Sequence, residues 1–213
     1  ESYKQLRTNI EFSGEENKII AVTSCTPSEG KSTVSLSTAY SLAEAGKKVL
    51  FIDADLRKSV LTGRYKISGE MKGLTHFLSG QGDLSEILCK TNEKGLFVIF
   101  AGPVPPNPAE LLGSKKFAAL LKEARNIYDY IIIDTPPLGS VIDSAIVSAV
   151  CDAAILVISA NTISYKFARS VKDQLAKTGC NILGVVLNKV SMKQNKYYGK
   201  YYGKYYGHYG SDK

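Results

Sequence analysis

Short, continuous apolar runs alternate along the chain with longer segments in which apolar residues recur at helical spacing. A continuous apolar run is typical of a strand buried on both faces, as in a parallel sheet whose crossover connections are helices. The alternation therefore predicts an α/β fold in which a mostly parallel sheet carries helices on both faces. The expected strands cover residues 19–24, 49–52, 96–100, 130–133, 153–158 and 182–187.

Helices are expected where apolar residues return every three or four positions. In the first of them Tyr3, Leu6 and Ile10 share one face, which makes residues 1–12 an amphipathic helix. The helix that follows the first strand ends before Gly46, a residue suited to the left-handed position that closes many helices. The expected helices cover residues 1–12, 32–45, 73–78, 83–88, 110–112, 115–126, 140–150 and 164–177.

The segment between the first strand and the next helix has the composition of a phosphate-binding loop, Ser28-Glu29-Gly30-Lys31-Ser32-Thr33. Gly30 lets the backbone approach an anion closely, and the amides at the helix start direct partial positive charge toward it. In such a loop Lys31 reaches the outer phosphates and Ser32 offers its hydroxyl to Mg²⁺. The chain has Cys25 where the pattern has Gly or Ala. The alternative interpretation is an ordinary strand-to-helix turn.

Three aspartates stand at the ends of predicted strands. Asp53 and Asp55 follow the apolar run 49–52 at alternate positions, so both point toward the crevice where such sheets bind ligands. Asp134 follows the run 130–133 and has the form of a Walker B aspartate, which holds Mg²⁺ directly or through water. The three carboxylates predict a metal or general-base site. In the alternative interpretation, Asp53 and Asp55 only cap the next helix.

Asn188 closes the last predicted strand. A polar residue at this place in P-loop proteins often meets the nucleotide base, so we assign Asn188 to adenine. The expected nucleotide-binding residues are Ser28, Glu29, Gly30, Lys31, Ser32, Thr33 and Asn188.

Length and composition limit the other possibilities. A chain of 213 residues with 44% hydrophobic content suits one α/β domain with a substantial core, expected over residues 1–190. There is no C-x-x-C pair, and the four cysteines lie far apart, which argues against a disulfide framework or a zinc site. No apolar run approaches the roughly 20 residues that a membrane span requires. Any membrane contact is therefore expected to be peripheral or through a partner.

The last stretch, residues 191–213, differs abruptly from the rest. Five lysines against Asp212 give it +4 of the net charge of +7, so the remainder is only mildly basic and no nucleic-acid partner is expected. A glycine at every fourth position, with no aliphatic partner, cannot build a core, so this tail is predicted to be a flexible arm. Seven of the thirteen tyrosines lie in its repeats: Tyr197, Tyr198, Tyr201, Tyr202, Tyr205, Tyr206 and Tyr209.

Three interpretations of the tail remain open. Aromatic rings interleaved with lysines suit stacking on single-stranded nucleic acid. The repeats could also be low-complexity filler. We favour an array of phosphoacceptors, because tyrosine hydroxyls on an arm attached to an ATP site invite phosphoryl transfer.

Taken together, these residues resemble the bacterial tyrosine kinases (BY-kinases), in particular the CpsD-type proteins of Gram-positive capsule and exopolysaccharide synthesis. The likeness runs the length of the chain, over the Walker A segment 25–33, the Walker A′ run 51–57, the Walker B run 131–136 and the tail. The A′ run and the tyrosine cluster are its specific parts, because P-loops alone occur in many unrelated enzymes. The resemblance implies an ATP- and Mg²⁺-dependent protein-tyrosine kinase that autophosphorylates its tail in trans between subunits and regulates polysaccharide synthesis.

The resemblance also implies a role for each site residue. Lys31 and the loop amides would hold the β- and γ-phosphates. Ser32, Asp55 and Asp134 would manage Mg²⁺, and Asp53 would take the proton from the incoming tyrosine. Transfer to a tyrosine of pKa ~10 needs such a base or a nearby metal field. The sequence alone does not decide which aspartate is the base and which is a Mg²⁺ partner.

In the family, an N-terminal Glu-x-x-Arg-x-x-Arg motif joins subunits into a ring, for which an octamer is one candidate size. The matching residues are Glu1, Lys4 and Arg7, with Lys in place of the usual first Arg. Lysine lacks the planar bidentate fork of arginine, which weakens the match. The alternative interpretation is a helix packed on its own domain with a solvated charged edge.

The resemblance implies two further partners, a membrane-bound polysaccharide co-polymerase that activates the kinase and a cognate tyrosine phosphatase. It places the protein in the cytoplasm, peripheral at the inner face of the membrane through its activator. The competing class is a positioning ATPase of the MinD and ParA type with a basic tail that binds nucleic acid or membrane. Those proteins carry a signature Lys early in the P-loop, where this chain has Thr26.

Overall fold

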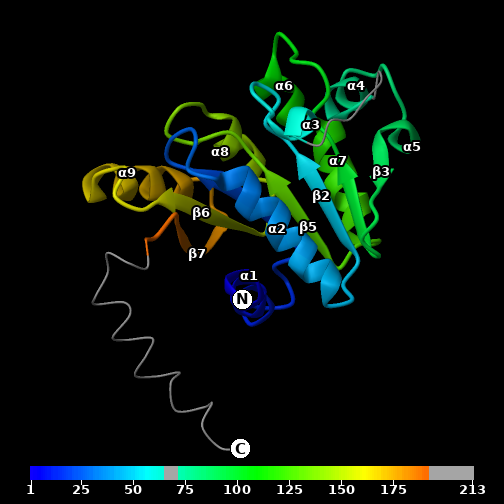
Figure 1. The fold of residues 1–213 in the computed structure, drawn as a ribbon. Coiled ribbons are helices and arrows are strands. Elements are labelled where there is room, and N and C mark those ends of the chain that lie inside the picture. Colours follow the sequence, from blue (N-terminus) through cyan, green and yellow to red (C-terminus); the bar gives the residue numbers. More distant parts are fainter. Residues whose placement is uncertain (65–71, 192–213) are drawn as a thin grey trace, which may run out of the picture.

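The computed structural model describes residues 1–64 and 72–191. Seven strands form one sheet in the order β3-β4-β2-β5-β1-β6-β7 (Figure 1). The strands are β1 (Ile19–Ser24), β2 (Val49–Asp53), β3 (Leu88–Lys90), β4 (Leu96–Ile99), β5 (Tyr130–Asp134), β6 (Ala153–Ser159) and β7 (Asn181–Asn188). The tyrosine-rich tail and its seven tyrosines, from Tyr197 to Tyr209, lie outside the described residues.

All strand pairs are parallel except β3 with β4, so the predicted α/β fold with a mostly parallel sheet is confirmed. The strand centres are apolar on both faces, because helices cover both. Leu50 and Ile52 of β2 belong to one core, and Val49 and Phe51 to the other. This alternation is the period-two geometry of a strand buried on both sides.

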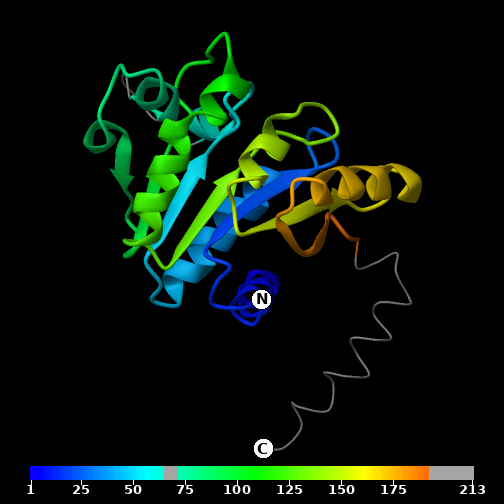
Figure 2. The same ribbon diagram turned by 180° about the vertical axis from the view of Figure 1, so that it is seen from behind.

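The helices divide unequally between the two faces. They are α1 (Ser2–Glu11), α2 (Lys31–Glu44), α3 (Leu61–Arg64), α4 (Leu74–Leu78), α5 (Leu84–Ile87), α6 (Pro108–Leu112), α7 (Lys115–Arg125), α8 (Asp143–Ser148) and α9 (Tyr165–Ala176). Residues of α1, α2 and α3 pack into the core on one face, and those of α4 to α9 into the core on the other. Figure 2 shows this second face, with α7 and α9 over the sheet.

The short elements are where sequence and structure differ. The helix predicted over 140–150 begins only at Asp143, because residues 138–140 form a turn after Pro137. The helix predicted over 83–88 gives way at Leu88 to β3, an antiparallel edge strand that the pattern did not indicate. The four-residue α3 was also missed. Gly46 has φ of 85°, as expected for the residue that closes α2.

Helix α1 packs against α2 beneath the sheet. Ile10 is buried, and the Arg7 guanidinium donates a hydrogen bond to the carbonyl of Ser41 in α2 at 2.9 Å. Arg7 also lies 4.0 Å from Glu11. Within one chain, α1 therefore packs on its own domain, as the alternative interpretation expects. Joining of subunits by Glu1, Lys4 and Arg7 stays a prediction.

Across the described parts of the chain, no helix combines the length and apolar character needed to cross a membrane. All four cysteines, Cys25, Cys89, Cys151 and Cys180, are free thiols.

Candidate active site

The loop between β1 and α2 wraps into a cradle at the carboxyl edge of the sheet. Two of its residues have left-handed backbone conformations, Ser28 with φ of 65° and Gly30 with φ of 88°. A Cβ atom at Gly30 would lie 2.2 Å from the Asn188 amide nitrogen, so only glycine fits this position. The amide of Thr33 bonds to the Gly30 carbonyl at 3.1 Å, which starts the helix directly behind the cradle. This is the geometry that presents amides to a phosphate.

The cradle is held from the β6–β7 side of the sheet. The buried Glu29 carboxylate accepts hydrogen bonds from the amides of Thr26 at 2.7 Å and Ser159 at 3.2 Å. Asn188 donates to the Glu29 carbonyl at 2.9 Å, and Lys189 donates to the Ser28 carbonyl at 2.6 Å. The Glu29 side chain therefore supports the loop, and any contact with nucleotide falls to its backbone. The assignment of Asn188 to adenine stays a prediction.

Lys31 converges with the predicted aspartates. Its ammonium lies 3.1 Å from both carboxylate oxygens of Asp134 and 3.5 Å from Asp55. It also lies 3.2 Å from the Ser32 hydroxyl. Asp53 and Asp134 are register partners on the neighbouring strands β2 and β5. The structure thus brings together the groups that the sequence predicts for phosphates, Mg²⁺ and the proton.

Burial raises the pKa of two carboxyls in this cluster, Asp53 and Asp134. It raises the pKa of Asp53 to about 7, with a further contribution from the nearby Asp134 carboxylate, while the Ser59 hydrogen bond opposes the rise. Burial also raises the pKa of Asp134, against the attraction of Lys31. A carboxyl of pKa near 7 suits a group that accepts a proton at neutral pH. The role of Asp53 as the base stays a prediction.

Asp53 and Asp55 accept hydrogen bonds from amides of the turn after β2, not from amides of the next helix, α3, which begins at Leu61. The Asp55 amide donates to Asp53 at 3.2 Å, and the Lys58 amide donates to Asp55 at 3.0 Å. These bonds shape the turn that follows β2. They leave Asp55 close to Lys31.

Several residues at the site were missed from the sequence. The Ser35 hydroxyl donates to Asp134 at 3.0 Å, and the Ser59 hydroxyl donates to Asp53. Arg57 binds the fully buried Asp143 through two hydrogen bonds. Ser35 lies four positions after Lys31, a helical spacing that would have indicated it. The other pairs depend on the tertiary fold.

Cys25 is buried in the loop, and burial raises the pKa of its thiol to about 12, with Glu29 adding to the rise. The thiol is therefore neutral and serves as a small packing residue. A Cβ at Gly139 would lie 2.2 Å from the Cys25 carbonyl, which shows how closely the segment after β5 approaches the loop.

Among residues 1–64 and 72–191, no group of three or more His, Cys, Asp or Glu side chains is arranged to hold a metal alone. Mg²⁺ does not need one, because it keeps several waters and is bound through one or two carboxylates plus substrate phosphates. Ser32 at the start of α2, Asp55 and Asp134 supply oxygen donors of the right type beside the cradle. The residues present therefore fit a Mg²⁺ that arrives with a nucleotide.

Fold and site together define a P-loop protein of the phosphoryl-transfer class. The AAA domain family model matches residues 17–178. Over 191 residues, 90% of this chain and 82% of the relative, the chain is 51% identical to the tyrosine-protein kinase CpsD of Streptococcus agalactiae. The chain belongs to the bacterial tyrosine kinase family, as its A′ run and tail predict.

Solved structures support the same family. The kinase domain of the Escherichia coli tyrosine kinase ETK is similar with a TM-score of 0.84 and 36% identity, over 89% of this chain and 74% of that one. The septum site-determining protein MinD of Pyrococcus horikoshii, solved with Mg-ADP, has a TM-score of 0.69 and 26% identity, over 83% and 72%. The kinase domain is thus the nearer of the two.

Proposed function

We propose that this chain is an ATP- and Mg²⁺-dependent protein-tyrosine kinase that phosphorylates the tyrosines of its own tail in trans between subunits. The family is one of tyrosine kinases, and close relatives carry that name. The observation that carries the proposal is the convergence of Lys31 with Asp53, Asp55 and Asp134 beside a phosphate cradle.

Each residue then has a part in the reaction. The loop amides and Lys31 bind the β- and γ-phosphates and neutralise their charge. Asp53 accepts the proton of the tyrosine hydroxyl as the phenolic oxygen bonds to the γ-phosphorus, while the bond from that phosphorus to the β–γ bridging oxygen breaks. The products are ADP and phosphotyrosine. Bound Mg²⁺ would add charge neutralisation at the phosphates, with Ser32, Asp55 and Asp134 as its donors.

The acceptors proposed are the seven tail tyrosines, and the proposed setting is capsular or exopolysaccharide synthesis. Assembly through Glu1, Lys4 and Arg7 would bring one subunit's tail to a neighbour's site. A membrane-bound polysaccharide co-polymerase would activate the kinase at the inner face of the membrane, and a tyrosine phosphatase would reverse the modification. Support for these partners comes from family membership alone.

The test is incubation with labelled ATP and Mg²⁺, with and without the cytoplasmic tail of the activator, followed by mapping of modified residues. Label on tail tyrosines, absent in Lys31→Met, supports the proposal. Hydrolysis stimulated by DNA, without label on tyrosine, would instead indicate a positioning ATPase. Mixing a Lys31→Met chain with a chain lacking tail tyrosines separates transfer in trans from transfer in cis.

A further inference from the structure

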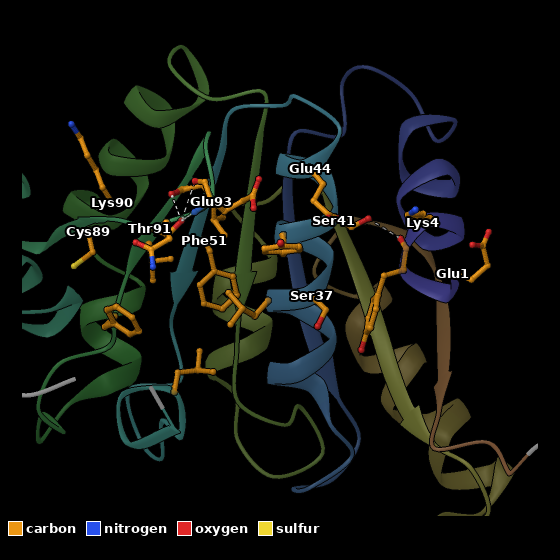
Figure 3. A pocket seen from close by; sticks show the side chains of 18 residues that line it. Glu1, Lys4, Ser37, Ser41, Glu44, Phe51, Cys89, Lys90, Thr91 and Glu93 are labelled. Carbon is orange, nitrogen blue, oxygen red and sulfur yellow. Dashed lines mark hydrogen bonds between the residues drawn. The ribbon is translucent and has the colours of Figure 1, made fainter. Parts of the chain in front are cut away.

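A groove of about 860 Å³ lies beside α2 on the face of the sheet that carries few helices. Figure 3 shows it from close by, with α2 on one side and the hairpin of β3 and β4 on the other. Its floor is formed by the sheet side chains Phe51, Leu96, Val98 and Phe100. Helix α2 packs mainly over β5 and β2, so β4 and β3 have no long helix over them on this face in the described structure.

One end of the groove is directed toward the acids of the site, although none of them lines it. Leu61 lines it and follows Ser59, whose hydroxyl binds Asp53, by two residues. Leu36 also lines it and directly follows Ser35, whose hydroxyl binds Asp134. A peptide that places a tyrosine at Asp53 therefore has the groove next to it.

The other end of the groove is acidic. Tyr40 is 44% exposed and donates a hydrogen bond from its hydroxyl to Glu93. That bond and the negative charges of Glu93 and Glu44 raise the pKa of Tyr40. Glu1 and Lys4, of opposite charge, line the groove together from the start of α1 on the far side of α2, and Lys90 lines it from β3. The Lys90 side chain extends away from Glu44 and Glu93 (Figure 3). The surface around Tyr40 is thus apolar and negative together.

One segment of this chain has the matching chemistry. The tail repeats Tyr-Tyr-Gly-Lys, with aromatic pairs for an apolar floor and a lysine for the carboxylates. An extended four-residue repeat spans about 13 Å. The α2 wall from Leu36 to Glu44 is about 12 Å long at the helical rise per residue. One extended repeat therefore matches the length of the wall.

We propose that this groove is a docking site for the tyrosine–lysine repeats of the tail, placed so that one repeat binds there while a neighbouring repeat is phosphorylated. The inference rests on the proposed kinase function and adds a substrate-binding surface to it. Phosphorylation adds roughly −1.5 to −2 charges per tyrosine at pH 7. A modified repeat is repelled by Glu44 and Glu93, so the groove selects repeats that have not yet reacted.

The first experiment measures binding without catalysis. A photo-crosslinking amino acid replaces Tyr201 in the full-length chain, and cross-links are mapped in the absence of nucleotide. Cross-links are expected on α2 and the β3–β4 hairpin, reduced about tenfold by the double change Glu44→Lys and Glu93→Lys. The matched control is Glu15→Lys with Glu123→Lys, which makes the same charge change at exposed positions outside the groove. Cross-links elsewhere, or equal loss in both doubles, would overturn the proposal.

The second experiment compares two peptides as acceptors, one copying residues 193–210 and one with a single tyrosine and no repeat. The variant with both Glu44→Lys and Glu93→Lys should have a KM for the repeat peptide about tenfold higher, with kcat unchanged. For the single-tyrosine peptide, both constants should stay unchanged. Equal effects on both peptides would contradict a docking role. Cross-links in the groove without any phosphate transfer would refute the proposed kinase function and support the docking site. Phosphate transfer without cross-links in the groove would support the kinase function and refute the docking site.

Discussion

The Asp143 carboxylate accepts two hydrogen bonds from the Arg57 guanidinium, at 2.7 Å from Nε and 2.9 Å from Nη2. Asp143 is fully buried at the start of α8, while the Arg57 side chain is 42% exposed. Arg57 follows the Asp53–Asp55 pair, and Asp143 follows the segment after Asp134. The ion pair therefore links the turn after β2 to the start of α8, beyond the acidic ends of β2 and β5.

Arg57→Ala should destabilise the fold by about 2–3 kcal/mol, the range for hydrogen bonds to charged groups, because it leaves Asp143 buried without a partner. Urea unfolding measures the loss. Asp143→Asn alone should cost less, and the double variant less than the sum of the two. Additive losses would show that the two side chains do not stabilise each other.

Asp53→Asn should change the stability of the protein and its phosphotransfer activity in opposite directions at pH 8. The folded pKa near 7 exceeds the ordinary value of 3.8, so the folded chain keeps a proton that the unfolded chain releases. The free energy of unfolding should therefore fall as the pH rises from about 4 to 7, by about 4 kcal/mol at 1.4 kcal/mol per pKa unit.

The asparagine variant lacks this loss, so at pH 8 it should be more stable than the parent by a few kcal/mol, and equal or less stable at pH 4. Unfolding curves at the two pH values, without nucleotide, check this. Phosphotransfer by the variant should fall more than tenfold. Identical pH dependence in both proteins would mean that Asp53 is ionised in the folded chain.

Lys31→Met should abolish phosphotransfer, because among the described residues Lys31 is the cation that pairs with Asp55 and Asp134 beside the loop. The structure adds a second effect. Lys31 forms an ion pair with the buried Asp134 and opposes the rise of its pKa, so losing Lys31 should raise that pKa further. The variant should therefore lose more stability than the parent as the pH rises above about 4, which circular dichroism melts across pH will show. Normal tail phosphorylation in this variant would refute the P-loop assignment.

Replacing all seven tail tyrosines by Phe should remove autophosphorylation and leave ATP hydrolysis, since the loop and its acids are unchanged. Replacing Tyr201 alone should do little, because the repeats substitute for one another. Mass spectrometry of the product measures both. Phosphotyrosine at the parent level in the seven-fold variant would place the acceptors elsewhere.

Two variants separate assembly from folding at α1. Arg7 bonds to the Ser41 carbonyl within the chain, whereas Glu1 and Lys4 are exposed. Glu1→Ala with Lys4→Ala should therefore shift the protein toward monomer without changing its melting temperature. Arg7→Ala should lower both mass and melting temperature. Light scattering and thermal melts test the pair, and an unchanged mass in both variants would remove α1 from the interface.

How far the sequence predicts this molecule depends on how local each signal is. The central strands were predicted because burial on both faces leaves continuous apolar runs. The acids at the ends of β2 and β5 were predicted because parallel strands end at one edge. β3 was missed because three residues of an edge strand carry too short a pattern, and its pairing with β4 is what defines it.

The partners of the acids were missed for a different reason. Arg57 and Asp143 are 86 positions apart, and no spacing rule relates them. The Lys189 contact with Ser28 spans 161 positions and depends on β7 lying next to β6. Such contacts follow from sheet order, which the apolar pattern does not determine. The groove could not be predicted either, because it arises where the sheet is wider than the helices on that face.

The sheet order has one further consequence. Strand β1 divides the sheet into two flanks, and the contacts of the cradle with Ser159 and Asn188 all come from the β6–β7 flank. Asp53, its hydrogen-bond partner Ser59 and the groove belong to the β2–β4–β3 flank. If the groove docks the acceptor, binding of the phosphate donor and choice of the acceptor rest on different parts of the sheet. We then expect mutations of groove residues, away from Asp55, to change the acceptor while the affinity for nucleotide stays constant.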